Sequence, residues 1–309
     1  MRAAVCPAYG PPEVVEVREL PEPESAAVRV VAAAVNFPDV LLVAGRYQVT
    51  VPPPFVVGSE FAGVVEVAGG GFAAGERVTG TGITGAFAEL VSANALHRIP
   101  DGVPFDVAAA AGVAHGTAYH ALRAVARVGA GDRVIVLGAG GGVGLAAVQL
   151  ATALGAEVTA VASTPEKRAV ARSYGAATVD SKGDLRAALR TALPDGAQAV
   201  LDPVGGDVAE PALRSLARGG RYVTIGFASG VIPRIPLNLV LIKGIQLLGC
   251  RIGDLDPELY RTHRAELAAL LADGTVRPHI GARYPLAETA AALRLVADGR
   301  AVGKVLIEP

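Results

Sequence analysis

A chain of 309 residues is long enough to form two domains, each with its own hydrophobic core. Its net charge is -1 and 51% of its residues are apolar, so we expect neither nucleic acid nor a membrane as a partner. Two cysteines, Cys6 and Cys250, are too few for a disulfide framework or a cysteine-built zinc site. The proline-rich start lacks the apolar core of a secretory signal, so we expect a soluble, cytoplasmic protein.

The N-terminal third has the pattern of an antiparallel, barrel-like β domain, because glycine and proline separate short apolar runs. The strands are expected at residues 3–6, 14–19, 27–34 and 61–67. Between two of them lies VNFPDVLLVAGRYQ, residues 35–48, where the polar residues Asn36, Asp39 and Tyr47 stand among apolar neighbours. The tight turn Gly58-Ser59-Glu60 then leads into a strand. Residues 103–128 are expected to be helical, with a break at residues 112–116.

The segment VIVLGAGGGVGLAAVQLATALG, residues 134–155, has the pattern of a strand, a glycine turn and a helix. Its first four residues suit a strand buried on both faces, and a helical apolar stripe begins at Val143. The turn contains Ala139-x-Gly141-x-x-Gly144, in which alanine replaces the usual first glycine. Unpaired N–H groups and the helix dipole make such a turn an anion site, so we expect a dinucleotide pyrophosphate there. The absence of charge across the segment could also indicate a membrane span, but its glycines and Gln149 argue against one.

From residue 132 onward the pattern alternates between strands and helices, which predicts an α/β domain with a parallel sheet covered on both faces. The strands are expected at residues 133–138, 157–162, 177–180, 197–202, 221–226 and 245–249. The helices are expected at residues 142–154, 165–174, 183–193 and 207–217.

The alternation stops after residue 249, where two amphipathic helices, residues 257–272 and 286–297, precede a last short strand. That strand could return to the N-terminal sheet. We therefore expect a doubly wound Rossmann domain, residues 113–250, inserted in a discontinuous β-rich catalytic domain made of residues 1–112 and 251–309. The cofactor is expected in the cleft between the two domains.

Several segments of the chain recur together in one known superfamily. They are VNFPDVLLVAGRYQ, PFVVGSEFAGVVEVAGG, GTAYHAL, GAGGGVGLAAVQLATALGA and GRAVGKVLIEP. With them the chain resembles the medium-chain dehydrogenase/reductase superfamily over its whole length, and within it the zinc-free quinone oxidoreductases. The resemblance implies that the first domain is GroES-like.

The resemblance also shows where this chain departs from the zinc alcohol dehydrogenases. Ser59 stands where that branch has a zinc-binding histidine, and Asn36 stands where it has a cysteine ligand. No counterpart of its four-cysteine structural lobe is present. Because zinc needs three or four nitrogen, sulfur or carboxylate ligands, we expect no metal. Ser59 is then a turn residue rather than a nucleophile, since no histidine base lies near it in the sequence.

By resemblance, Asn36 and Tyr47 line the nicotinamide and substrate cleft, and Thr117 lies beside the nicotinamide. These three residues are the catalytic candidates. Two of them also have a possible structural role. Tyr47 could be an aromatic residue of the core, and Thr117 could be an ordinary hydroxyl residue at the start of a helix. For Asp39, a place in the cleft and a role as a helix cap are equally expected.

The expected cofactor is NADPH, because the strand EVTAVAS, residues 157–163, ends without the acid that holds the ribose of NADH. Lys167 and Arg168 follow, and cations suit a 2′-phosphate, although an exposed basic helix face would also explain them. The full set of expected cofactor contacts is Ala139, Gly141, Gly142, Val143, Gly144, Ser163, Lys167, Tyr174, Phe227 and Lys304.

Together these features predict an NADPH-dependent reductase of quinones or other activated conjugated carbonyls, acting by direct hydride transfer without zinc. An enoyl-thioester reductase of the same fold is the nearest alternative. A more distant one is a non-catalytic NADPH-binding protein with a structural or RNA-associated role. We also expect a homodimer, because the apolar strand at residues 245–249 ends the parallel sheet and relatives commonly pair through that edge.

Overall fold

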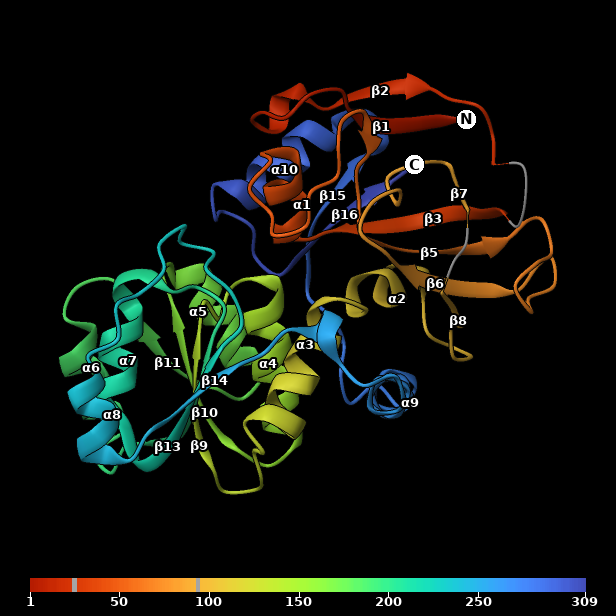
Figure 1. Ribbon diagram of the computed structural model, residues 1–309. Coiled ribbons are helices and arrows are strands. Elements are labelled where there is room, and N and C mark those ends of the chain that lie inside the picture. Colours follow the sequence, from red (N-terminus) through yellow and green to blue (C-terminus); the bar gives the residue numbers. More distant parts are fainter. Residues whose placement is uncertain (24–26, 93–94) are drawn as a thin grey trace. The chain divides into compact units, whose positions relative to one another are not determined.

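The computed structural model describes residues 1–23, 27–92 and 95–309, apart from the side chain of Asp254 (Figure 1). The chain divides into two compact units, Met1–Ala114 with Pro278–Pro309, and His115–Arg277. The sequence-based division placed the second boundary at residues 250/251. The helix α9 (Pro257–Ala272) lies in the second unit instead, where the hydroxyl of Tyr119 donates to Glu266 Oε2 at 2.7 Å.

The first unit is built on two sheets. The larger sheet has the order β15 (Ile280–Pro285), β16 (Lys304–Glu308), β3 (Ala27–Val35), β5 (Glu60–Val65), β6 (Arg77–Thr81) and β8 (Leu96–Arg98), and β7 (Leu90–Ser92) also pairs with β3. The smaller sheet has the order β2 (Glu16–Glu19), β1 (Arg2–Cys6) and β4 (Phe55–Val56). Pairing of β16 with β3 is antiparallel, with Leu306 opposite Ala34. This confirms the expected return of the last strand to the N-terminal sheet.

The helices of the first unit are short. They are α1 (Phe37–Val43), α2 (Phe105–Ala111), α10 (Thr289–Ala297), and the 3-10 turns η1 (Pro12–Val14) and η5 (Leu286–Glu288). Helix α1 was foreseen only through the possible capping role of Asp39, which is its third residue. The core of the unit collects buried apolar side chains from both sheets and from these helices, among them Val43, Phe87, Val78 and Ile307. Gly58 (φ +102°) sits against this core, and a Cβ there would lie 2.3 Å from the Phe87 ring.

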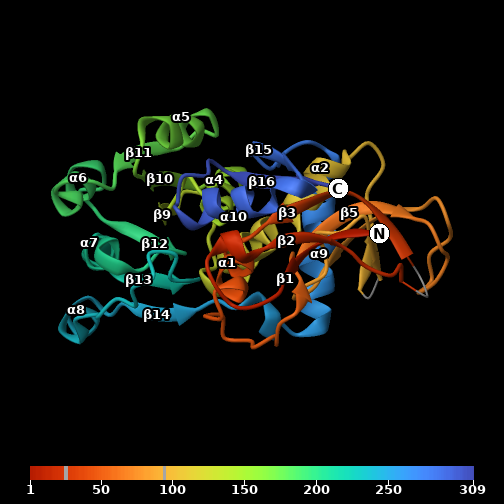
Figure 2. The same ribbon diagram turned by 90° about the horizontal axis from the view of Figure 1, so that it is seen from above.

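The second unit contains a six-stranded sheet in which every neighbouring pair is parallel (Figures 1 and 2). Its order is β11 (Ala177–Asp180), β10 (Glu157–Ala162), β9 (Arg133–Leu137), β12 (Ala197–Asp202), β13 (Leu216–Thr224) and β14 (Gln246–Gly249). This is the 3-2-1-4-5-6 order of a doubly wound sheet, so the predicted fold class is confirmed.

Helices connect these strands. They are α4 (Gly142–Ala153), α5 (Pro165–Ser173), α6 (Leu185–Ala192), α7 (Ala209–Arg214) and α8 (Leu237–Lys243), with η3 (Gly206–Val208) before α7. Helices α6 and α7 pack on one face of the sheet, where Leu189 and Leu213 contact Ile135 and its neighbours. Right-handed crossovers place α4 and α5 on the opposite face. The helix α3 (Ala114–His120), a π-helical turn η2 (Ala121–Val125), η4 (Ile252–Asp254) and α9 complete the helical elements.

One boundary differs clearly from the sequence analysis. Strand β13 begins at Leu216, not at residue 221, and the helix before it ends at Arg214. Gly219 and Gly220 look like the end of a loop, but they form a bulge inside the strand, where Ala197 faces Leu216 and Ala199 faces Arg221. In the part of the chain that the structure describes, no helix is both long and apolar enough to cross a membrane.

Candidate functional site

The glycine turn joins the end of β9 to the start of α4, and the backbone of the helix packs closely against the backbone of the turn. Gly138 has a φ of +60°, and Gly141 precedes the helix in an extended conformation. A Cβ on Gly144 would lie 2.1 Å from the carbonyl oxygen of Gly138, so only glycine allows the helix to approach the turn this closely. The first N–H groups of a helix have no partner within it, and here they face a turn without bulky side chains. This geometry fits a bound pyrophosphate.

Lys167 lies across the glycine turn. A Cβ on Gly140 would be 2.4–2.6 Å from Cβ, Cγ and Cδ of the lysine, so its aliphatic stem rests directly on the Gly140 backbone. Burial lowers the pKa of the Lys167 ammonium. The backbone N–H of Lys167 donates to Thr164 Oγ1 at 3.2 Å, which caps α5 and fixes the start of that helix. The residue predicted to read the 2′-phosphate is therefore next to the predicted pyrophosphate site.

The other residues near the end of β10 have different positions. Ser163 follows directly after β10 and is half-buried. Arg168, the second cation, is held by Asp180 at 2.9 Å and by the carbonyl oxygen of Ala162 at 3.0 Å, so it ties β10 to β11. Tyr174 caps the far end of α5, about 10 Å along the helix from Lys167 on a rise of about 1.5 Å per residue. The structure therefore brings Ser163 and Lys167 together with the turn, and does not bring Tyr174 there.

A second turn, which was not among the expected site segments, packs against the glycine turn. Asp202 ends β12, and its Oδ1 accepts the N–H groups of Val204 and Gly205, both at 2.8 Å, while Tyr222 donates to its Oδ2 at 2.6 Å. A Cβ on Gly138 would lie 2.6 Å from Val204, so the two turns touch. The sequence signal was present, because Pro203 and Gly205-Gly206 directly follow an apolar strand.

Phe227 lies at the same end of the sheet as these two turns. It follows β13, and its ring lies 2.9 Å from the position of a Cβ on Gly205. Because all six strands are parallel, the carboxyl ends of β9, β10, β12 and β13 all lie at the same end of the sheet. Most of the predicted cofactor contacts are found at this end of the sheet. They are Ala139, Gly141, Gly142, Val143, Gly144, Ser163, Lys167 and Phe227.

In the first unit, Lys304 is the centre of a buried polar network. Its Nζ donates to Asn36 Oδ1 at 2.6 Å, to Glu60 Oε1 at 2.7 Å and to the carbonyl oxygen of Val35 at 3.1 Å. Only 3% of the Lys304 side chain and 1% of the Glu60 side chain are exposed. The three hydrogens of the ammonium thus each have an acceptor inside this unit, and contact of Lys304 with the cofactor stays a prediction.

The Asn36 amide is fully engaged in the same network. Its Nδ2 donates to Glu60 Oε1 at 2.9 Å, to Ser59 Oγ at 3.1 Å and to the carbonyl oxygen of Ala34 at 3.3 Å. The carbonyl of the amide faces the ammonium and its nitrogen faces the carboxylate, which is the electrostatically favourable orientation. The two hydrogens of this amide are shared among three acceptors, so Asn36 helps to hold the side chains of Ser59 and Glu60 in position.

Asp39 borders this network and is completely buried. Its Oδ2 accepts the backbone N–H of Asn36 at 2.7 Å, which is the capping contact left open by the sequence, while its Oδ1 accepts no hydrogen bond among the described residues. Burial raises the pKa of Asp39 to about 7; the Asn36 N–H, the Ser59 hydroxyl and the Lys304 charge oppose this shift. A carboxyl that is partly protonated at neutral pH therefore lies beside the two residues that replace the zinc ligands.

Tyr47 and Thr117 lie in different units. Tyr47 is half-buried at the edge of the core of the first unit, and its hydroxyl has no hydrogen-bond partner among the described residues. Thr117 is a buried residue of α3 in the second unit, one turn before Ala121. The Tyr47 hydroxyl is thus available as a donor, whereas the catalytic role of Thr117 rests on the resemblance.

Two family models match the chain. Residues 22–101 match the model described as alcohol dehydrogenase GroES-like domain, and residues 142–271 match the one described as zinc-binding dehydrogenase. Among curated proteins, quinone oxidoreductase-like protein 2 of Bos taurus is 36% identical over 320 residues, covering 99% of this chain and 92% of that protein. Quinone oxidoreductase of Pseudomonas aeruginosa is 35% identical and covers 98% of both chains.

Among solved structures, a mycobacterial protein complexed with NADPH superposes with a TM-score of 0.92 at 31% identity, over 100% of both chains. Quinone oxidoreductase of Escherichia coli, also complexed with NADPH, gives a TM-score of 0.91 at 27% identity over 100% of both chains.

The name of the second family model raises the question of zinc, and the donors of this chain do not fit that metal. Zinc is bound by thiolate, imidazole or carboxylate groups. Asn36 and Ser59 offer neutral groups that are already hydrogen-bonded, and the Glu60 carboxylate holds the ammonium of Lys304. Across residues 1–23, 27–92 and 95–309, no three His, Cys, Asp or Glu side chains come together as a metal site.

Proposed function

The chain belongs to the quinone oxidoreductase group of the medium-chain dehydrogenase/reductase superfamily, and from this premise we propose that it reduces quinones or other activated conjugated carbonyls without zinc. It is an NADPH-dependent oxidoreductase. When bound, NADPH supplies the hydride. The chain's own residues bind the cofactor, orient the acceptor and keep water out of the site.

The observation that carries the choice of cofactor is the position of Lys167. Its stem covers Gly140 in the glycine turn, and the adjacent strand end, Ala162-Ser163, carries no acid to hold a 2′-hydroxyl. A cation on one side and the absence of a carboxylate on the other favour a 2′-phosphate over a free ribose. Lys167 is therefore the leading contact, because its stem lies on the turn, and Ser163 is the second. Arg168 ties β10 to β11 through Asp180.

The nature of the acceptor follows from the network around Asn36. The residues there present no zinc-type ligand set, so the protein has no metal to polarise a carbonyl oxygen at that position. The acceptor must then be electrophilic by itself, as quinones and conjugated carbonyls are. Simple ketones are expected to be poor substrates.

Hydride transfer leaves negative charge on the acceptor oxygen, and a donor placed there stabilises the transition state more than the ground state. Tyr47 is the proposed donor, because its hydroxyl has no partner among the described residues. Asn36 is proposed to act through Ser59 and Glu60, since both of its amide hydrogens are engaged by neighbours. Thr117 is proposed to lie beside the nicotinamide ring.

The decisive experiment measures NADPH oxidation with a panel of quinones, enones, simple ketones and enoyl thioesters, with and without a chelator. We expect turnover with quinones or enones that is unchanged by the chelator. Preferred turnover of enoyl thioesters would instead identify an enoyl-thioester reductase. Binding of NADPH without turnover of any member would favour the non-catalytic alternative.

We also propose that the protein is a cytoplasmic homodimer. Strand β14 is at the edge of the parallel sheet, as the sequence analysis expected. The neighbouring helix α8 exposes three large apolar side chains, Leu237, Leu241 and Ile242, and Leu247 of β14 is exposed as well. An uncovered apolar edge is a pairing hazard, and two-fold pairing with a second copy would cover it.

A further inference from the structure

Asp202, the last residue of β12, lies where the strand order of the parallel sheet reverses. Strands β9 and β12 are neighbours, with β10 and β11 on the far side of β9, and β13 and β14 beyond β12. In a doubly wound sheet, a dinucleotide binds across the carboxyl ends of the strands at this reversal. Two turns flank that point, the glycine turn after β9 and the turn at residues 203–206 after β12.

The side chain of Asp202 holds the second turn in place. It is completely buried, and its Oδ1 accepts the N–H groups of Val204 and Gly205, both at 2.8 Å. Tyr222 of β13, also buried, donates its hydroxyl to Oδ2 at 2.6 Å. Burial and the adjacent charge of Asp202 raise the pKa of Tyr222, so the hydroxyl keeps its proton and remains the donor. One carboxylate thus ties the turn after β12 to the neighbouring strand.

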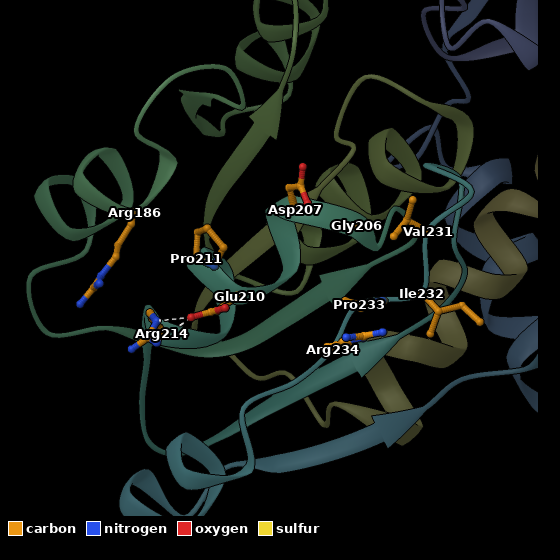
Figure 3. A pocket seen from close by; sticks show the side chains of 10 residues that line it. All are labelled: Arg186, Gly206, Asp207, Glu210, Pro211, Arg214, Val231, Ile232, Pro233 and Arg234. Atoms are coloured by element: carbon orange, nitrogen blue, oxygen red, sulfur yellow. Dashed lines mark hydrogen bonds and ion pairs between the residues drawn. The ribbon is translucent and has the colours of Figure 1, made fainter.

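The main-chain carbonyl of Asp202 fixes the segment that follows β13. It accepts the N–H groups of Ile225 at 2.8 Å and Gly226 at 3.3 Å. At the other end of the turn, the N–H of Gly206 donates to the carbonyl oxygen of Val231 at 2.9 Å, and both residues line one cavity (Figure 3). Asp202 therefore joins the turn after β12 to the loop after β13.

This joined segment packs directly on the predicted cofactor site. A Cβ on Gly138 of the glycine turn would lie 2.6 Å from Val204, so the two turns touch. Gly205 has a φ of +67°, and a Cβ there would lie 2.9 Å from the ring of Phe227. A shift of the turn after β12 would consequently displace its neighbours on both sides.

We propose that Asp202 and Tyr222 are positioning residues for NADPH, which hold the turn at residues 203–206 in the conformation that receives the nicotinamide half of the cofactor. Lys167, after the end of β10, is the proposed contact of the 2′-phosphate, so the adenine half lies over β9 and β10 and the other half over β12 and β13. A turn that is already ordered costs less binding free energy than one that the ligand must order. This inference rests on the cofactor site proposed above and is independent of the acceptor.

The test compares two probes in calorimetric titrations of the whole chain without an acceptor. NADPH reports on the entire cofactor site, and adenosine 2′,5′-bisphosphate reports on the adenine half alone. Tyr222→Phe keeps the buried ring and removes the hydroxyl, so Oδ2 of Asp202 loses its donor. We expect this variant to raise the Kd for NADPH about fivefold or more, while the Kd for adenosine 2′,5′-bisphosphate stays within about twofold.

Two substitutions of Asp202 grade the effect. Asp202→Leu removes the acceptors of the two turn N–H groups and of the Tyr222 hydroxyl, so it should weaken NADPH binding more than Tyr222→Phe does. Asp202→Asn retains an oxygen for the turn and should bind NADPH better than Asp202→Leu. Where Asp202→Leu does not fold, Tyr222→Phe decides the question alone.

Tyr119→Phe is the matched control. Tyr119 is also buried and donates its hydroxyl to a carboxylate oxygen, Glu266 Oε2, at 2.7 Å, but this contact joins α3 to α9. The control variant should lose comparable stability in thermal unfolding and leave both Kd values unchanged. Lys167→Ala should weaken both probes, because both carry the 2′-phosphate, and so tests the cofactor site separately from the positioning role.

A selective loss of NADPH affinity in Tyr222→Phe supports the proposal. An unchanged Kd for NADPH in that variant would overturn it, even where Lys167→Ala behaves as expected. Equal losses for NADPH and adenosine 2′,5′-bisphosphate would overturn it as well, because they would show that Asp202 and Tyr222 only stabilise the fold.

Discussion

Lys304 and Glu60 form an ion pair that is nearly inaccessible to solvent, although the two residues are 244 positions apart in the sequence. Lys304 begins β16 and Glu60 begins β5, and β3 lies between these strands in the sheet. Desolvating two charges is costly unless their remaining hydrogen-bonding groups are satisfied. Here Asn36 and the Val35 carbonyl satisfy the ammonium, and the N–H of Val113 donates to Glu60 Oε2 at 2.8 Å.

Removing the cation should therefore be much more harmful than losing a surface ion pair. We expect Lys304→Met to lower the free energy of unfolding by about 3–5 kcal/mol, because it leaves a buried carboxylate without its partner. The measurement is chemical denaturation near neutral pH. Adding Glu60→Gln to Lys304→Met should recover part of the loss, since the remaining group is then neutral.

Arg300→Met provides the matched control for this prediction. Arg300 also lies close to the start of β16, but its side chain is 64% exposed and its ion pair with Asp298 is on the surface. Such a pair contributes about 0–1 kcal/mol. Equal losses in Lys304→Met and Arg300→Met would contradict the assigned importance of the buried pair.

Asp39 should make the first unit less stable as the pH rises. Its pKa is about 7 in the folded protein against an ordinary 3.8, so the folded state holds the proton more tightly. The stabilisation from this proton is complete below the ordinary pKa, falls by about 1.4 kcal/mol per pH unit above it, and is lost as the pH passes the folded pKa. Asp39→Asn cannot ionise and should remove this part of the pH dependence.

The comparison is made as the difference in unfolding free energy between parent and Asp39→Asn from about pH 5 to about pH 7. Taking the difference matters because His120 and His263 have pKa values lowered by burial, and they act in the opposite direction. Asp101→Asn, at an exposed position, is the control. A difference that stays constant over this range would show that Asp39 titrates at the same pH in the folded and unfolded chain.

The sequence predicted the parallel sheet well because its signals are local. Strand β9 contains a continuous apolar run, and β10 and β12 are mostly apolar. At the glycine turn the apolar pattern changes from that of a strand to that of a helix. Strand β13 was misplaced because Gly219 and Gly220 signal a loop, while pairing with β12 keeps them inside the strand. Tertiary hydrogen bonding overrode the local signal there.

The candidate site was predictable only in part. The resemblance identified Asn36 and Lys304 separately, but nothing local in the sequence indicates that they share a hydrogen bond across two strands of one sheet. The saturation of the Asn36 amide is likewise a property of the packed network. Lys167 was predicted from the missing acid at the end of β10, and its contact with Gly140 came only from the structure.

Lys167 should discriminate between the two nicotinamide cofactors. We expect Lys167→Ala to raise KM for NADPH about ten- to a hundredfold, as for loss of one charge-assisted contact, and to change KM for NADH only a few-fold. Arg172→Ala is the control, because it removes the same charge from the exposed side of α5. An equal effect of Lys167→Ala on both cofactors would show that Lys167 does not contact the 2′-phosphate.

The exposed apolar edge of the second unit predicts a dimer that one charge can disrupt. Leu241 is 84% exposed on α8, so Leu241→Glu should leave the fold intact and place a charge in the proposed interface. We expect the parent chain to have a dimer mass and the variant a monomer mass at micromolar concentration, measured by light scattering. Lys182→Glu is the control, because Lys182 is exposed just after β11, the strand at the opposite edge of the sheet from β14. A monomeric parent chain would refute the proposed assembly.

The final prediction concerns the chemical step. Tyr47→Phe keeps the aromatic ring, which packs against the core of the first unit, and removes only the hydroxyl. If this hydroxyl donates to the acceptor oxygen, its loss should cost about 1–3 kcal/mol in the barrier, or about five- to a hundredfold in kcat with a quinone. Binding of NADPH should stay within a few-fold, because the donor acts on the acceptor.

Tyr284→Phe is the matched control, since Tyr284 is a second half-buried tyrosine packed against the same core, on β15. The comparison is made under conditions where a deuterium isotope effect shows that hydride transfer limits turnover. A slower hydride step in Tyr47→Phe alone supports the donor role. Equal rates in both variants would remove Tyr47 from the mechanism, because a transition-state hydrogen bond cannot be lost without raising the barrier. Orientation of acceptor and cofactor would then be the remaining contribution of the protein to the rate.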